Sequence, residues 1–333
     1  MIIHKYITHI LDKQSDVPIL NDFEGKITLQ VDKFLQKTLK KVLKEDSLRK
    51  AKFLDYENNE IRKITDEIIY NEKTFIENSK EIAAYLFDLM KKTENIESCD
   101  LIVSLITIKD EKIIAIIKVD YKKIYNHTVE FEDDKFNIQM IENEIGISET
   151  FRAKQCALIG VNGLNDEYDL RVIDIEAEKE LEKSLFIEEF IKAKNIIDDT
   201  YKTMKFISTT SSWINSYFDN LPSRYKNFEF LSYVMLNTSA IDIEDFSEKL
   251  LGNDDAAKES FIEALESKNI TNFNIDKKVA EKRFKNINLK GLFKFKCGLD
   301  EFNNPNIVKI VADGDNYNLV IKDIGALTID SGC

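Results

Sequence analysis

Lysine and arginine side chains gather in two short segments of this sequence, where their charge is suited to phosphate binding. In residues 33–52, eight such side chains stand against only Glu45 and Asp46, a local charge of +6. In residues 277–296, eight stand against Glu281 alone, a local charge of +7. A row of cations can replace the counterions that surround a nucleic-acid backbone. Both segments are therefore candidate contacts to the DNA backbone.

The spacing of the first five lysines predicts a helix with one basic side. They are 4, 3, 1 and 3 residues apart, which places them on one helix face, opposite Leu35 and Val42. The candidate DNA-binding residues are Lys33, Lys37, Lys40, Lys41 and Lys44 in the first segment and Lys277, Lys278, Lys282, Arg283 and Lys285 in the second. A solvated helix face in a lysine-biased proteome explains either stripe without DNA, and this alternative stays open.

Asp120, Asp133 and Lys135 suggest a second kind of chemistry. They have the D…D-x-K order in which metal-dependent nucleases hold Mg²⁺ with two acids and polarise the phosphate with a lysine. Charged residues make up 32% of the chain, so such an order also arises by chance, and the run at 132–134 is typical of a turn. A nuclease is an alternative hypothesis that requires these three side chains to meet.

Other catalytic and cofactor sites find little support in the sequence. The 10 glycines form no phosphate-binding loop, and only three histidines are available for a metal site or a catalytic triad. The four cysteines form no CxxC pair. Cys99, Cys156 and Cys297 lie beside apolar residues, where a thiol is an inert small hydrophobe. We therefore predict a non-enzymatic protein without a metal or cofactor.

Composition indicates a soluble globular protein with an acidic body. The 333 residues are 43% hydrophobic, and 47 Lys+Arg stand against 60 Asp+Glu, a net charge of −13. An acidic body repels phosphate, which excludes a wholly basic nucleic-acid binder and confines any DNA contact to local patches. The start of the chain lacks a signal peptide, and no run of 18 apolar residues could span a bilayer, so we expect a cytoplasmic protein.

Residues 1–176 predict an α+β domain with an antiparallel sheet and helices. Apolar spacing predicts helices over 31–43 and 74–90. The predicted strands are 2–10 and 26–30 as an opening hairpin, 101–108 and 113–119 as a second hairpin, and 157–161 with 168–175 as a further pair.

Residues 177–333 predict a mostly helical domain that ends in a β-hairpin. Helical periodicity runs from Glu178 to Ser267, with Asp242 and Asp254 as expected N-caps and Gly252 as a stop. The predicted C-terminal strands are 292–296, 307–312 and 317–321. The fold class expected for the whole chain is thus α+β, with an N-terminal antiparallel sheet, a helical middle and a C-terminal hairpin.

The most specific pattern in the chain is IDIEDFSEKLLG at residues 241–252. It is similar to a short helix reading roughly I-x-L-x-x-[LF]-S-x-x-L-x-G in the bacterial nucleoid-associated protein family, the NdpA or YejK group. An acidic cap and a Phe-containing helix follow at 254–265, and the strand at 293–296 and the final hairpin correspond in order. The chain therefore resembles this family, whose motifs are structural and supply no catalytic residue.

The resemblance implies association with the nucleoid and no known reaction. It implies contact with double-stranded DNA or with a DNA-acting partner such as a type II topoisomerase, and we expect a homo-oligomer. Residues 165–189 hold ten acids against three basic residues, which suggests a protein-facing surface. The alternative function is therefore an adaptor or regulator of a DNA-acting enzyme, or part of a multi-protein defence complex, without direct DNA binding.

Overall fold

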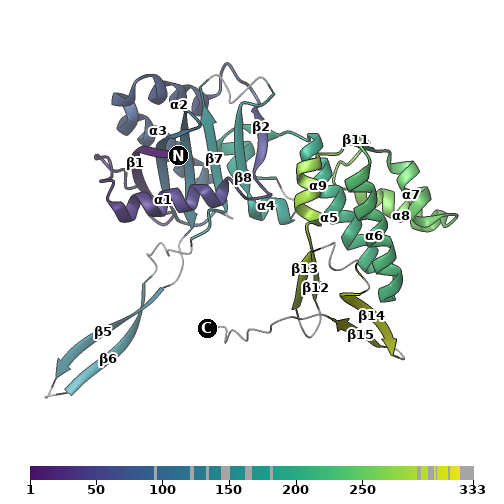
Figure 1. Ribbon diagram of the computed structural model, residues 1–333. Coiled ribbons are helices and arrows are strands. Elements are labelled where there is room, and N and C mark those ends of the chain that lie inside the picture. The colour runs from purple at the N-terminus through teal and green to yellow at the C-terminus, as the bar shows by residue number, and fades with distance from the viewer. Residues whose placement is uncertain are drawn as a thin grey trace. The chain divides into compact units, whose positions relative to one another are not determined.

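A computed structural model describes residues 1–93, 96–120, 124–132, 135–143, 151–161, 167–180, 183–290, 294–298, 304, 306–313 and 316–322. The chain has an N-terminal antiparallel sheet, a helical middle and C-terminal strand pairs (Figure 1), which confirms the predicted α+β class. It forms two compact units, Met1–Ile196 and Ile197–Cys333. None of the described helices combines the length and the apolar character needed to cross a membrane.

Seven strands form the antiparallel sheet of the first unit, in the order β1-β3-β4-β7-β8-β2-β9. They are β1 (Ile2–Leu11), β2 (Arg49–Phe53), β3 (Cys99–Ile108), β4 (Glu111–Asp120), β7 (Gln155–Gly160), β8 (Leu170–Asp174) and β9 (Ala193–Asn195). The predicted pairs β3–β4 and β7–β8 are confirmed. This unit also includes residues 177–196, because β9 pairs with β2 in the same sheet.

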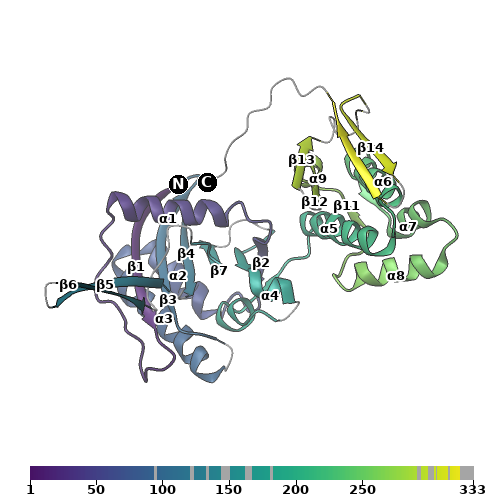
Figure 2. The same cartoon turned by 90° about the horizontal axis from the view of Figure 1, so that it is seen from below.

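Both faces of the sheet are covered, which explains why β3 and β4 are continuous apolar runs. Leu101 and Val103 belong to the cluster under α2 (Glu60–Tyr70) and α3 (Phe75–Lys92). Ile102 and Ile106 belong to the cluster under α1 (Leu29–Val42). Figure 2 shows α1 on one side of the sheet and α2 and α3 on the other. Helix α1 is thus an outer layer whose remaining side is open to solvent.

The predicted opening hairpin is wrong. β1 pairs with β3, and residues 26–30 lead into α1. The Thr28 hydroxyl accepts a hydrogen bond from the Val31 N–H at 3.3 Å and caps the helix N-terminus. A threonine in this position satisfies one of the N–H groups that the first turn leaves unpaired. The cap, together with burial of the apolar side of α1, outweighs the strand propensity of the short segment.

His9 is fully buried on β1, beside α3. Its Nδ1 accepts a hydrogen bond from the Asn21 N–H at 3.1 Å, so the proton lies on Nε2, which donates to Ser79 Oγ at 3.0 Å. Burial, assisted by the charge of Lys80, lowers the pKa of His9 from 6.5 to about 4. The folded unit therefore holds His9 neutral at physiological pH.

Acidification should destabilise the first unit through His9. In the unfolded chain His9 takes up a proton with a pKa of 6.5, and in the folded unit with a pKa of only about 4. The stability that depends on neutral His9 is therefore complete above the unfolded pKa and is lost as the pH falls to the folded pKa. The loss amounts to at most about 3 kcal/mol. Urea unfolding followed by far-UV circular dichroism at about pH 7 and pH 4.5 should show a smaller pH effect in His9→Asn. Equal pH effects in both proteins would contradict the assignment.

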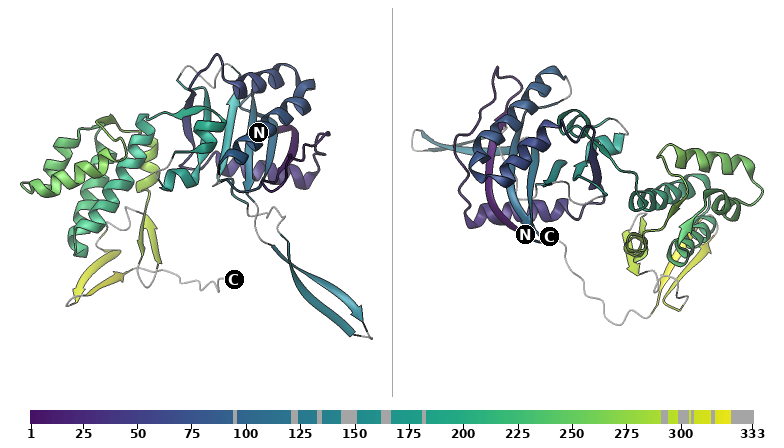
Figure 3. Two further views of the ribbon diagram at one scale, coloured as in Figure 1. Left: turned by 180° about the vertical axis from the view of Figure 1, so that it is seen from behind. Right: turned by 90° about the horizontal axis from the view of Figure 1, so that it is seen from above.

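The second unit is a bundle of helices around an aromatic core. Its helices are α5 (Asp199–Tyr217), α6 (Leu221–Asn237), α7 (Ile243–Leu251), α8 (Asp255–Glu266) and α9 (Lys277–Phe284). Phe206 is fully buried at the centre, with the rings of Phe246 at 5.0 Å and Phe273 at 5.4 Å between centroids. Figure 3 shows these helices, in green, packed against one another in both views.

The predicted caps of α7 and α8 and the predicted stop between them are confirmed. The helical periodicity predicted from Glu178 is wrong in part, because β9 is a strand that pairs with β2 and α5 begins only at Asp199. Asp242 and Asp254 accept hydrogen bonds at 3.0 Å from the N–H groups of Asp245 and Ala257 and cap α7 and α8. Gly252 ends α7 with a φ of 63°, a backbone region that a side chain disfavours.

Short strand pairs and turns complete the chain. The remaining elements are β5 (Ile124–Glu132) with β6 (Lys135–Asn143), β10 (Ala240–Ile241) with β11 (Phe273–Asn274), β12 (Asn286–Lys290) with β13 (Lys294–Gly298), β14 (Val308–Asp313) with β15 (Asn316–Ile321), α4 (Ile175–Glu180), the 3₁₀ turn Glu72–Thr74 and the π-turn Leu185–Phe190. The predicted final hairpin is β14–β15. The β5–β6 hairpin was not predicted, since its sequence was interpreted as polar segments around a turn.

Candidate nucleic-acid interface

Helix α1 presents its lysines from a fixed position on the sheet. The exposed members of the stripe are Lys33, Lys37, Lys40 and Lys44, and Lys41 is half-buried. On the other side of the helix, Leu35 and Leu39 are at most 1% exposed and pack in the cluster beneath α1. Because this side anchors the helix, the charged side is held outward as a rigid row.

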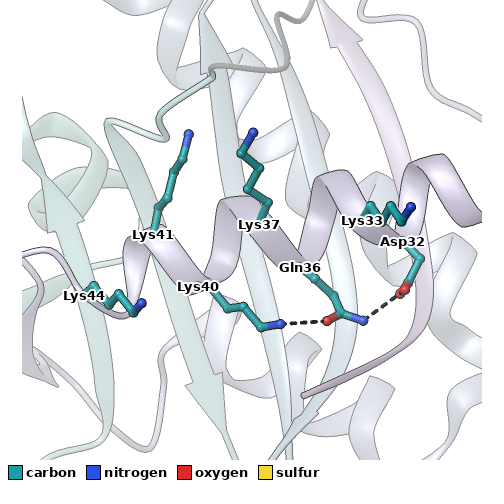
Figure 4. A pocket seen from close by; sticks show the side chains of 7 residues that line it. All are labelled: Asp32, Lys33, Gln36, Lys37, Lys40, Lys41 and Lys44. Carbon is teal, nitrogen blue, oxygen red and sulfur yellow. Dashed lines mark hydrogen bonds between the residues drawn. The ribbon is translucent and has the colours of Figure 1, made fainter. Parts of the chain in front are cut away.

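The stripe lines a shallow cavity of about 390 Å³. Its lining residues are Asp32, Lys33, Gln36, Lys37, Lys40, Lys41 and Lys44 (Figure 4). Lys40 Nζ donates to Gln36 Oε1 at 3.1 Å, and Gln36 Nε2 donates to Asp32 Oδ2 at 2.9 Å. Figure 4 shows Lys37 and Lys41 extending to one side of the helix and Lys40 to the other. Asp32 is the one acid in this lining, so the cavity is positively charged.

Residues 151 and 152 contact the end of the stripe. Lys41 Nζ donates to the Phe151 carbonyl at 3.1 Å. Arg152 forms a two-pronged ion pair with Glu45, with Nε–Oε1 at 2.8 Å and Nη2–Oε2 at 2.5 Å. Glu45 is thereby neutralised, although it follows Lys44 directly in the sequence. The positive charge of α1 is therefore not cancelled at this end.

The side chains of three lysines in the stripe, Lys33, Lys37 and Lys44, make no hydrogen bond or ion pair with the described part of the chain. From Lys33 to Lys44 the helix advances about 16 Å at 1.5 Å per residue. One strand of B-DNA advances about 3.4 Å per nucleotide. The stripe therefore matches the length of about five nucleotides, and its cations are available to phosphates.

Lys277, the first candidate of the second segment, is occupied within the protein. Its half-buried Nζ donates to the carbonyls of Met235 at 3.2 Å and Leu236 at 2.8 Å, and also to that of Thr238. These carbonyls lie at the C-terminal end of α6, where backbone acceptors have no helical partner and carry partial negative charge. Lys277 thus caps the C-terminus of α6 and connects α9 to α6 through these hydrogen bonds.

The other candidates of the second segment form an exposed row on α9 and its C-cap residue. They are Lys278, Lys282, Arg283 and Lys285. Lys278, Lys282 and Lys285 are four and three residues apart, which places them on one face of the helix. Ala280 and Phe284 are buried on the opposite side. The side chains of Lys290, Lys294 and Lys296 lie outside the part of the chain that the structure describes.

The structure does not bring Asp120 and Lys135 together. Asp120 ends β4 and pairs with Lys118 and, at 3.8 Å, with Lys154. Lys135 begins β6 at the far end of the β5–β6 hairpin, opposite Glu132. Asp133 lies outside the described residues. Among the described residues, no group of three or more acids, histidines or cysteines could hold a metal ion.

A second, larger cavity was not predicted. Its volume is about 600 Å³, and its charged residues include Lys118, Asp120, Lys154, Asp174 and Glu176. Lys154 pairs with Glu176, and this contact raises the pKa of Lys154. The lining holds three lysines and four acids, so its opposite charges are nearly balanced. No sequence spacing could have revealed this cavity, because its residues come from α3, α4, three strands and the segments that connect them.

Two cysteines behave as predicted. Cys99 and Cys156 are buried, and burial raises the pKa of each thiol to about 12. A thiol with so high a pKa is not a nucleophile at neutral pH. These residues therefore serve as small apolar side chains.

Part of the acidic segment 165–189 faces inward. Asp169 Oδ2 accepts a hydrogen bond from the Phe53 N–H at 2.9 Å. Asp174 is buried and accepts from Ser184 Oγ at 2.6 Å and from Gln155 Nε2 at 2.8 Å. These two carboxylates hold neighbouring parts of the first unit together, so fewer than the ten acids of the segment can face a partner.

Comparison with known proteins identifies the family. No match was found among curated proteins. The sequence matches the family described as nucleoid-associated protein YejK over residues 7–327 of its 333. The match spans both compact units and includes both lysine segments. The chain therefore belongs to the family of nucleoid-associated protein YejK.

Proposed function

We propose that this protein contacts the backbone of double-stranded DNA in the bacterial nucleoid, in the cytoplasm, through the stripe on α1. Lys33, Lys37, Lys40, Lys41 and Lys44 are the proposed contacts, and the first three with Lys44 are exposed. The single observation that carries the proposal is this positively charged cavity on a helix whose opposite side is fixed to the sheet. Backbone contacts of this kind attract DNA of any sequence.

The exposed row on α9 is proposed as a second contact. It consists of Lys278, Lys282, Arg283 and Lys285, and Lys277 holds the helix to which they belong. Two separate patches in an acidic chain would let the protein bind DNA locally while the rest of its surface is repelled. In this proposal the protein is an oligomer, so several copies bind the same DNA together and the overall affinity exceeds that of one copy. It has no reaction of its own.

The test is fluorescence anisotropy of labelled AT-rich and GC-rich duplexes at about 50 and about 200 mM salt. About four phosphate contacts predict a loss of affinity of roughly 100-fold between these salt concentrations. A preference for AT-rich duplexes would indicate that groove shape is recognised. Absence of binding at either salt concentration would contradict direct DNA contact.

The second candidate function is an adaptor that reaches the nucleoid through a DNA-acting enzyme, such as a type II topoisomerase, or within a defence complex. It is favoured by the acidic segment 165–189, in which Glu188 and Glu189 are exposed. Such a protein would bind its partner without DNA. Tight DNA binding by the purified protein alone would contradict it.

A further inference from the structure

Five large apolar side chains are exposed on the β5–β6 hairpin. They are Val129 (54% exposed), Phe131 (61%), Phe136 (73%), Ile138 (66%) and Met140 (75%). The strand register pairs Phe131 with Phe136 and Val129 with Ile138, and Met140 lies two residues beyond Ile138. Residues directly opposite in an antiparallel pair share a face. The five side chains therefore form one surface, which we call the apolar hairpin face.

Near the turn, the reverse face of the hairpin is polar. Thr128 is paired with Gln139, and Glu130 and Lys135 are exposed. The alternation of apolar and polar residues on both sides of the turn is typical of a sheet that packs on one side and meets water on the other. Phe131 and Phe136, with ring centroids 4.9 Å apart, complete the apolar side near the turn. The hairpin thus has the residue pattern of a sheet that packs against another layer, yet its apolar side chains are exposed.

An uncovered hairpin of this kind is poorly stable. A two-stranded hairpin alone in water is marginal and needs a further layer on its apolar side. Among the described sheets, β5 and β6 pair only with each other. A contiguous apolar surface of this size marks an interaction site. Something outside the described part of this chain should therefore cover the apolar hairpin face.

Charge argues against DNA as the covering partner. Residues 124–143 contain five acids, of which Glu130, Glu132 and Glu142 are in the strands, against Lys135 as the only Lys or Arg. Negative charge along the hairpin repels phosphates. The five side chains of the apolar hairpin face are uncharged, and the register places Glu142 only at the end of the hairpin away from the turn. Two equally acidic chains can therefore meet there without like charges facing each other at the centre.

We infer that the apolar hairpin face binds the same face of a second copy of this chain. Two hairpins packed face to face about 10 Å apart form a four-stranded sandwich, apolar inside and polar outside, so each copy covers the other. Such a twofold contact needs only one self-complementary patch. Each Phe can bury about 150–250 Å², so the five side chains approach the roughly 800 Å² that one partner buries in a standard interface.

The test compares neighbouring residues on opposite faces. Ile138→Asp places a charge at the centre of the apolar hairpin face, and Gln139→Asp places the same charge on the reverse face. Sedimentation equilibrium over a range of concentrations, without DNA, should give twice the 38.6 kDa chain mass for the wild type and for Gln139→Asp. Ile138→Asp should give the mass of one chain, with Trp213 fluorescence and far-UV circular dichroism unchanged.

Three results would overturn the inference. They are a monomeric wild type, an Ile138→Asp protein that remains dimeric, and a Gln139→Asp protein that dissociates equally. A monomeric wild type would assign the face to a different protein. The inference goes beyond the proposed DNA contacts and does not rest on them, because the measurement contains no DNA and the substitutions leave both lysine rows intact.

Discussion

Replacing Lys33, Lys37 and Lys44 by Glu should abolish most of the DNA affinity. These side chains are exposed and have no partner in the described part of the chain, so their loss removes phosphate contacts without breaking an internal bond. Loss of three contacts should reduce the slope of log K against log salt by about 2.7. At about 50 mM salt we expect a loss of affinity of at least roughly 100-fold, measured by fluorescence anisotropy.

The matched control changes the net charge equally on the other side of the sheet. Its substitutions are Lys63→Glu, Lys73→Glu and Lys92→Glu, at exposed positions in and beside α2 and α3. This variant should retain most of the affinity and nearly the whole salt slope. Equal losses in both triple variants would show that net charge alone governs binding. Unchanged binding by the α1 variant would exclude the stripe.

Replacing Lys277 by Met should lower the free energy of unfolding of the second unit by about 2–3 kcal/mol. A hydrogen bond to a charged group contributes about 1.5–3 kcal/mol, and the Lys277 ammonium donates to three carbonyls at the end of α6. Methionine keeps the apolar stem but leaves these acceptors unpaired. The chain has a single tryptophan, Trp213, which lies in the core of this unit. Its fluorescence during urea unfolding therefore reports the second unit alone.

Lys278→Met is the control for Lys277→Met. Lys278 is exposed on the same helix and makes none of the contacts to α6, so its replacement should change the stability by less than about 0.5 kcal/mol. The DNA affinities should show the opposite order, with the larger loss for Lys278→Met. A Lys277→Met protein of unchanged stability and weakened DNA binding would contradict the assignment of Lys277 to the fold.

The local structure was largely determined by the sequence. The β-branched runs that form β3 and β4, the Asp242 and Asp254 caps and the Gly252 stop all act within a few residues. Propensity and capping decide such features without help from distant contacts. The lysine spacing on α1 belongs to the same class, because helix geometry alone places these side chains on one face.

The partners of the strands were decided only in the tertiary structure. β1 pairs with β3 across about ninety residues of chain, and no local signal distinguishes this partner from the nearer segment at 26–30. The apolar hairpin face was missed for a different reason. Its alternation is visible in the sequence, but acids around the turn gave it the appearance of a solvated segment.

Charge alone could not separate binding lysines from structural ones. Lys277 and Lys278 are adjacent and chemically identical, yet the first is turned toward the end of α6 and the second toward solvent. The sequence by itself determined the fold class, the caps of α7 and α8 and the basic side of α1, because these follow from short-range patterns. Only the tertiary structure decided which cations remain available to a phosphate, because long-range packing sets which backbone acceptors lie within reach of each side chain.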